Sequence, residues 1–309
     1  MEGYTGRVGE IPQGLRLDRY VAEYLGLLSR SQIKAKNLAA RINGKNVKIS
    51  RQVKTGDLLE LSWAEAGPSD LIPEDLPLDV IYEDSRVVVI NKAQGMVVHP
   101  GAGNHTGTLA NALLFRRLER GGEGEGFRPG IVHRLDKDTS GVIIAAYDDE
   151  ALAFLAEQFK ARKTRKIYAA LVTGVPLEPE GIIETFIARD SRDRKKFAVS
   201  PGKGKAARTA YRVVHVWKGY SLLMLRPRTG RTHQIRVHLK YLGCPILGDP
   251  LYGKPDGRFP RAALMLHAKS LSLVIPGPPG CRTAMGEYRT FRTPLPGRFR
   301  ELLGILRRS

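Results

Sequence analysis

Apolar segments of strand length and of helix length follow one another in this chain without regular alternation. Residues 87–90 and 142–146 are short, continuous apolar runs of the kind found in buried strands, whereas residues 109–118 have helical spacing. A doubly wound fold needs strands and helices in strict turn, so this order argues against it. We therefore predict an α+β fold with a mixed, largely antiparallel sheet.

Further elements can be assigned from local signals. Asp148 has the character of a helix cap, and Leu152, Leu155 and Phe159 follow on one helical face. Gly243 stands where a helix over residues 232–242 would end. Two more strands are predicted over residues 167–172 and 222–225, and a closing helix over residues 300–307.

A change of composition divides the chain. The run Gly67-Pro68-Ser69-Asp70, followed by Pro73 and Pro77, is typical of a linker. We expect a small domain over residues 1–66, a linker over 67–77 and a large domain over 78–309.

The small domain has signals for helices and a hairpin. Leu15, Leu17, Val21, Leu25 and Leu28 recur at helical spacing. Ser29 and Gln32 have the spacing of a capping box for a second helix reaching toward Arg41. Asn43-Gly44 predicts a tight hairpin turn, and a strand is expected over residues 58–61.

Charge is the most informative part of the composition. The chain has 50 Lys and Arg against 31 Asp and Glu, a net charge of +19. Residues 28–54 include eight basic residues and no acidic one, and residues 160–166 and 192–196 hold further basic clusters. Separate basic patches favour an extended contact with a phosphate backbone, so nucleic acid is the expected partner.

Other compartments and partners are less favoured. No apolar run approaches the ~20 residues that span a bilayer, and the N-terminus does not resemble a signal peptide. The only cysteines, Cys244 and Cys281, are far apart in sequence, so a disulfide framework is not expected. We expect a cytoplasmic protein without a membrane partner.

Three segments concentrate polar residues in apolar surroundings. They are residues 130–141, which precede a predicted buried strand, residues 165–168, and residues 229–238, where a Gly turn opens a helix. Polar side chains held at the edge of a rigid sheet are typical of a reactive site.

Common catalytic and cofactor motifs are not matched. Ser140 is not in a nucleophile elbow, so a triad with His133 and Asp136 is disfavoured. The histidines show no metal-ligand spacing, and the glycines of residues 101–107 and 202–205 fit neither a dinucleotide fingerprint nor a P-loop. We expect chemistry by side chains alone, with no metal, nucleotide or other cofactor.

The three segments resemble the signature segments of the RluA family of pseudouridine synthases. They read His133-Arg134-Leu135-Asp136, Lys166-Ile167-Tyr168 and the run from Gly230 to His238. Residues 91–101, 248–253 and 266–268 resemble further parts of the family, over about residues 78–295. Residues 15–63 are similar to the S4 RNA-binding domain that many members carry.

The resemblance implies roles for individual residues. Asp136 matches the catalytic aspartate, which either attacks C1′ of uridine or removes a nearby proton. Arg236 matches the arginine expected to form a bidentate pair with that aspartate, keeping it ionised and aimed. Tyr168 would stack on the uracil ring and Ile235 would form the opposite apolar wall. Arg134 is a candidate for filling the space that the displaced uridine leaves.

Further residues are expected to contact the base or the RNA. They are His133 and Arg231 in the large domain, and Arg30, Lys34, Lys36, Arg41 and Lys45 in the small one.

The resemblance implies an RNA pseudouridine synthase acting on ribosomal RNA of the large subunit, as a monomer. Two alternatives stay open at this stage. One is the same chemistry on transfer RNA, and the other is a non-catalytic RNA-binding or ribosome-assembly factor. An intact set of Asp136, Tyr168 and Arg236 argues against the second, because a binding protein needs none of them.

Overall fold

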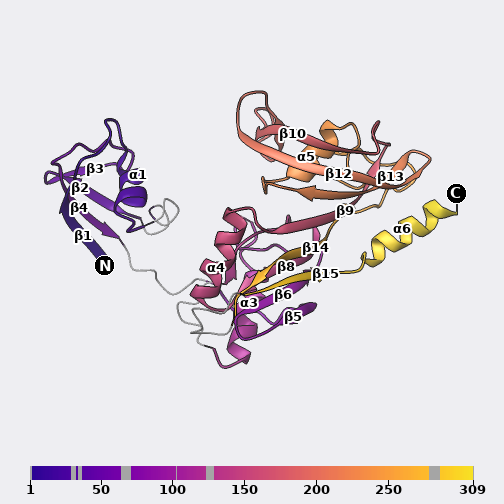
Figure 1. Ribbon diagram of the computed structural model, residues 1–309, viewed down its shortest axis with the longest axis horizontal. Helices are drawn as coiled ribbons and strands as arrows, with labels where there is room; N and C mark the ends of the chain where they lie inside the picture. The colour runs from indigo at the N-terminus through magenta and orange to yellow at the C-terminus, as the bar shows by residue number, and fades with distance from the viewer. Residues whose placement is uncertain are drawn as a thin grey trace. The chain divides into compact units, whose positions relative to one another are not determined.

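The computed structural model describes residues 2–28, 33, 37–63, 71–101, 103–122, 129–277 and 286–308. The chain forms two compact units. Residues described up to Trp63 belong to an N-terminal unit, and those from Leu71 onward belong to a C-terminal unit (Figure 1). Each unit has its own hydrophobic core.

The N-terminal unit packs a short helical segment against a small sheet. The helical segment consists of α1 (Leu17–Arg19) and a π-helical turn, η1 (Tyr20–Tyr24). The antiparallel sheet has the order β1-β4-β2-β3, formed by Glu2–Arg7, Leu58–Trp63, Ala39–Ile42 and Lys45–Val47. Leu17, Val21 and Leu59 are fully buried between them.

The predicted hairpin is confirmed. β2 pairs with β3, and both turn residues have positive φ, 50° for Asn43 and 75° for Gly44, as the tight primed turn requires. The expected extension of a second helix toward Arg41 is wrong, because β2 begins at Ala39. Its capping box, Ser29 and Gln32, lies outside the described residues.

The C-terminal unit is built on one large sheet. Its strands follow the order β11-β10-β12-β13-β9-β14-β8-β6-β5, while β15 pairs with β14 and β7 pairs with β8. In the same order, their bounds are Phe197–Val199, Glu180–Arg189, Lys205–Trp217, Tyr220–Pro227, Arg165–Thr173, Leu266–Ile275, Ser140–Ala146, Val87–Lys92, Val80–Glu83, Glu287–Arg292 and Gly130–Ile131.

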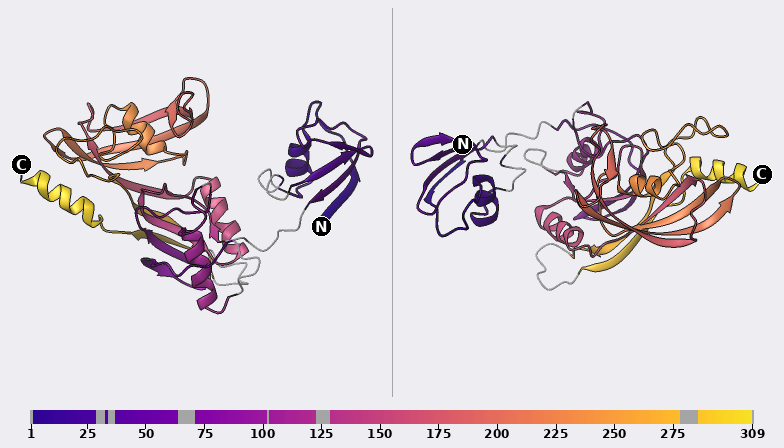
Figure 2. Two further views of the ribbon diagram at one scale, coloured as in Figure 1. Left: turned by 180° about the vertical axis from the view of Figure 1, so that it is seen from behind. Right: turned by 90° about the horizontal axis from the view of Figure 1, so that it is seen from above.

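The predicted α+β class with a mixed, largely antiparallel sheet is confirmed. Among the described strands, only β14 and β8 pair in parallel. Figures 1 and 2 show the strands from β10 to β13 in one half of the unit and β5, β6, β8 and β15 in the other, with β9 and β14 joining them. The junction of the two halves therefore passes through β9 and β14.

Four helices complete the described part of the C-terminal unit. α4 (Asp149–Lys160) is capped by the Asp148 side chain, as predicted, and α5 (Gln234–Tyr241) ends before Gly243, whose φ is 79°. α5 begins two residues later than expected, because His233 has a left-handed φ of 56°. The other two are α3 (Leu109–Glu119) and α6 (Gly297–Arg307).

Gly141 brings two central strands into close contact. A Cβ atom at this position would lie 2.2 Å from the Ala268 carbonyl oxygen, and the φ of 116° also disfavours any side chain. Gly141 pairs with Ala268, which in turn pairs with Tyr168. β8 is thereby held against β14, whose other neighbour is β9.

No helix in the described ranges is long and apolar enough to cross a membrane.

Candidate active site

A cavity of about 320 Å³ lies in the C-terminal unit. Its lining comes chiefly from the three polar segments that the sequence singled out, here residues 132–136 with Thr139, Lys166 with Tyr168, and residues 229–236. Pro227 also lines it. Phe159 of α4 and Leu266 of β14 complete it. Segments separated by up to a hundred residues are thus brought to one place by the central strands.

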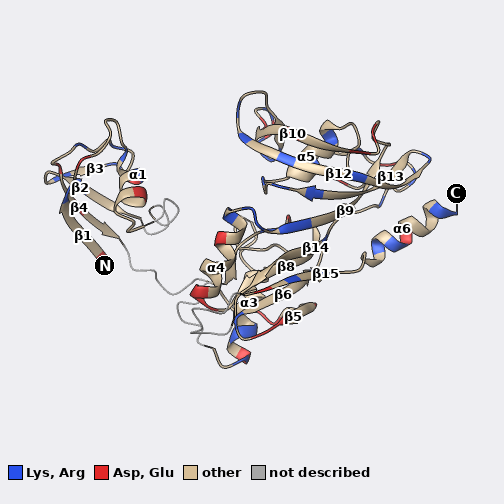
Figure 3. Cartoon of the chain, in the orientation of Figure 1, with Lys and Arg blue, Asp and Glu red and all other residues tan. Residues whose placement is uncertain are grey.

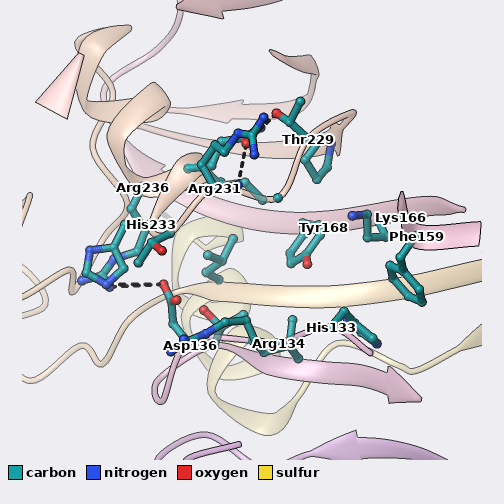
Figure 4. Close-up of a pocket in the computed structure, with 18 of the residues that line it drawn as sticks. His133, Arg134, Asp136, Phe159, Lys166, Tyr168, Thr229, Arg231, His233 and Arg236 are labelled. Atoms are coloured by element: carbon teal, nitrogen blue, oxygen red, sulfur yellow. Dashed lines mark hydrogen bonds and ion pairs between the residues drawn. The ribbon is translucent and has the colours of Figure 1, made fainter. Parts of the chain in front are cut away.

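The two ends of the cavity differ in chemistry. Figure 4 shows Tyr168 in the middle, with one group of side chains on each side. At one end lie Asp136, His233 and Arg236, and at the other lie Lys166, Phe159 and His133.

Asp136 stands in the loop before β8 with a partly accessible carboxylate. Its side chain is 20% exposed, and Oδ2 lies 3.4 Å from Nη1 of Arg236 and 4.0 Å from Nε2 of His233. Both contacts are long, so the carboxylate faces the cavity with little direct restraint.

The backbone of this loop, by contrast, is firmly held. The side chain of Lys92 is buried, 1% exposed, and its ammonium group donates hydrogen bonds to the carbonyls of Ala93, Met96 and Lys137. Burial lowers the pKa of Lys92 to about 8, while the charges of Asp138 and Asp136 act in the other direction. The Gln94 amide donates to the Asp138 carbonyl from the same side.

Arg236 lies beside Asp136, but its bidentate fork engages another residue. Nε and Nη2 each donate to a carboxylate oxygen of Asp249 at 2.8 Å, which leaves Nη1 to face Asp136. The expected ion pair between Arg236 and Asp136 is present as a single contact, but its expected bidentate geometry is wrong. The sequence placed Asp249 in a family-like run, but its role as the partner of Arg236 depends on a tertiary contact that no spacing encodes.

Asp249 is itself fully enclosed. Its side chain is 0% exposed, and its Oδ1 also accepts hydrogen bonds from the backbone N–H groups of Leu251 and Tyr252. Burial alone would raise the pKa of Asp249, but the Arg236 guanidinium and these N–H groups hold it below its ordinary value. The pair is charged and leaves Arg236 little freedom to move.

His233 is oriented by a hydroxyl group. Its Nδ1 lies 2.9 Å from Oη of Tyr252, and that oxygen already accepts the N–H of Phe197 at 2.9 Å. The tyrosine hydrogen is therefore available for Nδ1, which places the imidazole hydrogen on Nε2, the atom facing Asp136. Burial lowers the pKa of His233 despite the nearby Asp136, so the ring is neutral at pH 7.

Tyr168 and Ile235 give the cavity its apolar walls. Ile235 belongs to α5 and is only 7% exposed, and Tyr168 is partly buried on β9. Burial raises the pKa of Tyr168, and the charge of Asp136 adds to the effect. The phenol therefore stays protonated and can serve as a flat surface for a ring.

His133 is a wall residue rather than a proton carrier. Its ring stacks on Phe159 with centroids 4.6 Å apart, and its Nε2 accepts the N–H of Ile144. Burial, with a smaller contribution from Lys166, lowers its pKa to about 3. The ring is neutral with its hydrogen on Nδ1.

The loop that leads into α5 is organised by Gln234, which sequence reasoning did not single out. Its Oε1 accepts hydrogen bonds from the Thr229 hydroxyl and the Arg231 N–H, and its Nε2 donates to Thr209. Arg231 lines the cavity and donates from Nε to the Ala206 carbonyl. A buried amide with partners for each of its groups fixes the loop that carries Arg231.

The remaining predicted residues lie at the rim or in the other unit. Arg134 is exposed and lines the cavity. In the N-terminal unit, Arg41 is paired with Glu60 at 3.3 Å and Lys45 is exposed on β3. Three others, Arg30, Lys34 and Lys36, lie outside the described residues.

A metal site is not indicated by the residues that the structure describes, since they contain no group of three or more His, Cys, Asp or Glu arranged to hold an ion.

Comparisons with known proteins agree on one family. Residues 86–241 match the family described as RNA pseudouridylate synthase. Ribosomal large subunit pseudouridine synthase D of Borreliella burgdorferi is 44% identical, covering 92% of this chain and 87% of that protein. The protein of the same name from Zymomonas mobilis is 41% identical, covering 85% and 87% respectively.

Solved structures give the same result. The human protein RNA Pseudouridylate Synthase Domain Containing 4 matches with a TM-score of 0.60 and 29% identity, covering 74% of this chain and 92% of that one.

Proposed function

This chain belongs to the RNA pseudouridylate synthase family, and we propose that it isomerises uridines of large-subunit ribosomal RNA to pseudouridine with Asp136 as the catalytic residue. The observation that carries the proposal is the Asp136 carboxylate, which opens into a cavity walled by Tyr168 and Ile235. Two relatives named for the ribosomal large subunit favour this RNA over transfer RNA. Membership of an enzyme family disfavours a purely RNA-binding role.

The proposed reaction breaks one bond to the sugar and forms another. The N1–C1′ bond of uridine is cleaved after Asp136 attacks C1′ or removes a nearby proton. The freed uracil turns while stacked on Tyr168, and C5 joins C1′. In the first route the bond between Asp136 and C1′ breaks as C5 joins, and in the second the removed proton returns to the sugar. The hydrogen on C5 leaves as a proton and N1 takes one up, so the product is an isomer of uridine. Ile235 closes the opposite side and keeps water from the intermediate.

Arg236 acts by position and charge. Its Nη1 is the group nearest to the Asp136 carboxylate, and its fork is anchored by the buried Asp249. His233 presents a neutral N–H to the same carboxylate from 4.0 Å. Two fixed donors on one side would steer the free lone pairs of Asp136 toward the cavity.

Arg134 suits a role outside the cavity. It is exposed at the rim, directly before the loop of Asp136. A base-modifying enzyme must take its target out of the stack, and a planar guanidinium can stack in the space that is left.

The N-terminal unit is proposed to be an S4-like RNA-binding domain over residues 1–66, joined by a linker over residues 67–77. Support comes from its short helical segment, the β2–β3 hairpin and the acid-free basic run of residues 28–54. Arg30, Lys34, Lys36, Arg41 and Lys45 of that run would contact phosphates. The protein is proposed to act as a monomer in the cytoplasm.

The test is to map pseudouridine in ribosomal and transfer RNA from cells that lack the protein. Loss of specific pseudouridines from large-subunit RNA, restored by the wild-type chain and not by Asp136→Asn, is the expected result. Loss confined to transfer RNA would reject the ribosomal substrate. An unchanged pattern in both RNA classes would reject the enzyme assignment for this chain.

A further inference from the structure

A second hollow of about 230 Å³ continues from the basic end of the active-site cavity. The two share Phe159, Lys166, Thr229, Gly230 and Arg231 in their linings. The hollow adds Lys160, Arg162, Thr164 and Arg228, and no acidic residue lines it. Figure 3 shows the basic residues at the end of α4 and the start of β9.

The cations of this hollow lack carboxylate partners of their own. Within the described part of the chain, Lys166, Arg162 and Arg228 form no ion pair, and Lys160 makes only an exposed contact of 3.6 Å with Glu157. Lys166 lies over the Phe159 ring at 5.7 Å instead. The hollow therefore concentrates positive charge that neighbouring carboxylates do not neutralise.

The surrounding electrostatics agree with an anion site. Burial lowers the pKa of Lys166, so its ammonium group has already lost part of its hydration. The pKa of Arg226, two residues before Arg228, is lowered by burial and then by the charges of Arg228 and Arg165. Mutual repulsion of this kind is relieved when an anion binds between the cations.

The walls of the hollow are fixed before any ligand arrives. Gln234 holds the backbone of Arg231 and the hydroxyl of Thr229, and the Arg231 Nε is tied to the Ala206 carbonyl. Arg162 follows α4 in a left-handed turn with φ of 57°, its N–H bonded to the Phe159 carbonyl. Because this backbone is already fixed, an anion would order only the side chains of Arg162 and Arg228, which lowers the entropy lost on binding.

We propose that this hollow is a phosphate subsite, which binds the RNA backbone phosphate next to the target uridine through Arg162, Arg228 and Lys166. The inference rests on the proposed function, because it takes the uridine to lie in the adjoining cavity. Its volume admits a phosphate group with some water, since a water molecule occupies about 30 Å³. Guanidinium groups suit the ligand because they bind phosphate oxygens bidentately.

The test compares two double variants that remove equal charge. Arg162→Gln/Arg228→Gln changes the hollow, whereas Lys163→Gln/Arg165→Gln changes two exposed residues of the same basic stretch that do not line it. Affinity for a large-subunit ribosomal RNA transcript is measured across salt concentrations. The first variant should lose roughly tenfold in affinity and about 0.7 in the log–log salt slope, the value for one phosphate contact on a single strand. The control should lose less than half as much in both quantities.

A second measurement locates the phosphate. In a short RNA that carries the target uridine, single phosphates beside it are replaced by uncharged methylphosphonates. One replacement should weaken the wild type roughly three- to tenfold, weaken the control variant equally, and leave Arg162→Gln/Arg228→Gln unaffected.

The subsite would be overturned if the two double variants lost affinity and salt slope equally. It would also be overturned if every methylphosphonate replacement weakened Arg162→Gln/Arg228→Gln as much as it weakens the wild type. Failure of the proposed function looks different, because the wild type would then bind RNA and form no pseudouridine. The salt slopes are read from binding alone, so they judge the subsite in that case too.

Discussion

Charged side chains are held differently in the two units of the chain. Arg41 of the N-terminal unit is 53% exposed and meets Glu60 on the surface, whereas Arg236 and Asp249 of the C-terminal unit are 6% and 0% exposed. An exposed ion pair contributes about 0–1 kcal/mol, while removing one partner of a buried pair costs about 3–5 kcal/mol.

The difference indicates how each unit uses its charge. In the C-terminal unit, single buried groups such as Asp249 and Lys92 fix the geometry around Asp136, so one substitution should have a large effect. In the N-terminal unit the described basic residues are exposed. If they act together on the RNA backbone, as proposed, only the loss of many should be measurable.

The largest effect is expected for Asp136→Asn. The substitution keeps the size of the side chain and removes the charge and basicity on which cleavage depends, so turnover should fall by about 10²–10⁴-fold. RNA affinity should stay within a few-fold, because phosphate contacts dominate binding. Single-turnover rates at saturating enzyme measure the first quantity, and filter binding measures the second.

Asp138→Asn is the matched control. Asp138 lies in the same loop, but its side chain does not line the cavity. Its variant should keep activity within a few-fold. Equal losses in both variants would show a damaged loop rather than a missing catalytic group.

Asp249→Asn should have the next largest effect. The side-chain amide of this variant has one acceptor oxygen and no charge, so it cannot accept the hydrogen bonds of both Nε and Nη2 of Arg236. The guanidinium then loses one hydrogen bond and its negatively charged partner. We expect kcat to fall about a hundredfold, equivalent to ~3 kcal/mol, while RNA affinity stays unchanged. A rise in KM at constant kcat would contradict this positioning role.

Asp256→Asn makes the same chemical change at another carboxylate of the unit. Asp256 bonds to the Tyr220 hydroxyl and does not line the cavity. Its variant should keep normal kcat, and melting temperatures of both variants separate loss of fold from loss of geometry.

Lys92 gives a smaller effect with a defined pH dependence. Its pKa is about 8 in the folded chain against an ordinary value of 10.5, so between these values the unfolded chain binds more protons. Raising the pH through this window therefore stabilises the folded state, by up to about 3 kcal/mol from this group. The unfolding free energy of wild type minus that of Lys92→Met should rise by this amount from pH 8 to 10.5.

Taking the difference between the two proteins cancels the other lysines and tyrosines that titrate in the same range. If this difference in unfolding free energy does not change with pH, the pKa of Lys92 is not lowered in the folded chain. At pH 7, Lys92→Met should also lower kcat more than it changes KM, because the Lys137 carbonyl in the Asp136 loop loses its donor.

The sequence predicted the elements whose signals are local. The cap at Asp148, the turn at Asn43-Gly44 and the apolar strands β6 and β8 each depend on a few neighbouring residues. β10 and β12 were not predicted. β10 has apolar residues on both faces, because Ile182 and Phe186 are 56% and 46% exposed while Ile183 and Ile187 are buried. The alternation that marks a half-buried strand is therefore missing.

The site was predicted as a set of residues but not as a geometry. Family-like motifs identified Asp136, Tyr168 and Arg236, and the fold brings all three to one cavity. The contact of Arg236 with Asp249 and that of His233 with the Tyr252 hydroxyl arise from the tertiary fold. The separation of these residues in the sequence does not indicate how close they lie in space. The Asp136 loop likewise depends on Lys92, a buried lysine that a sequence pattern places on the surface.

The smallest effects are expected for single substitutions in the N-terminal unit. They test whether its exposed basic residues act only together. Arg41→Gln removes an exposed charge with a 3.3 Å surface contact to Glu60, so the unfolding free energy should change by less than about 0.5 kcal/mol and RNA affinity by less than about twofold. Calorimetry and filter binding measure the two quantities.

Deletion of residues 1–66 removes the whole basic run at once. Each lost phosphate contact lowers the log–log salt slope by about 0.7–0.9, so a unit that contacts several phosphates should reduce the slope by several units and weaken binding. Catalysis at saturating RNA should persist, because every residue that lines the cavity belongs to the C-terminal unit. An unchanged slope would show that the N-terminal unit does not bind the RNA backbone. A large loss from Arg41→Gln alone would instead mean that its charges act singly, as those around Asp136 are expected to do.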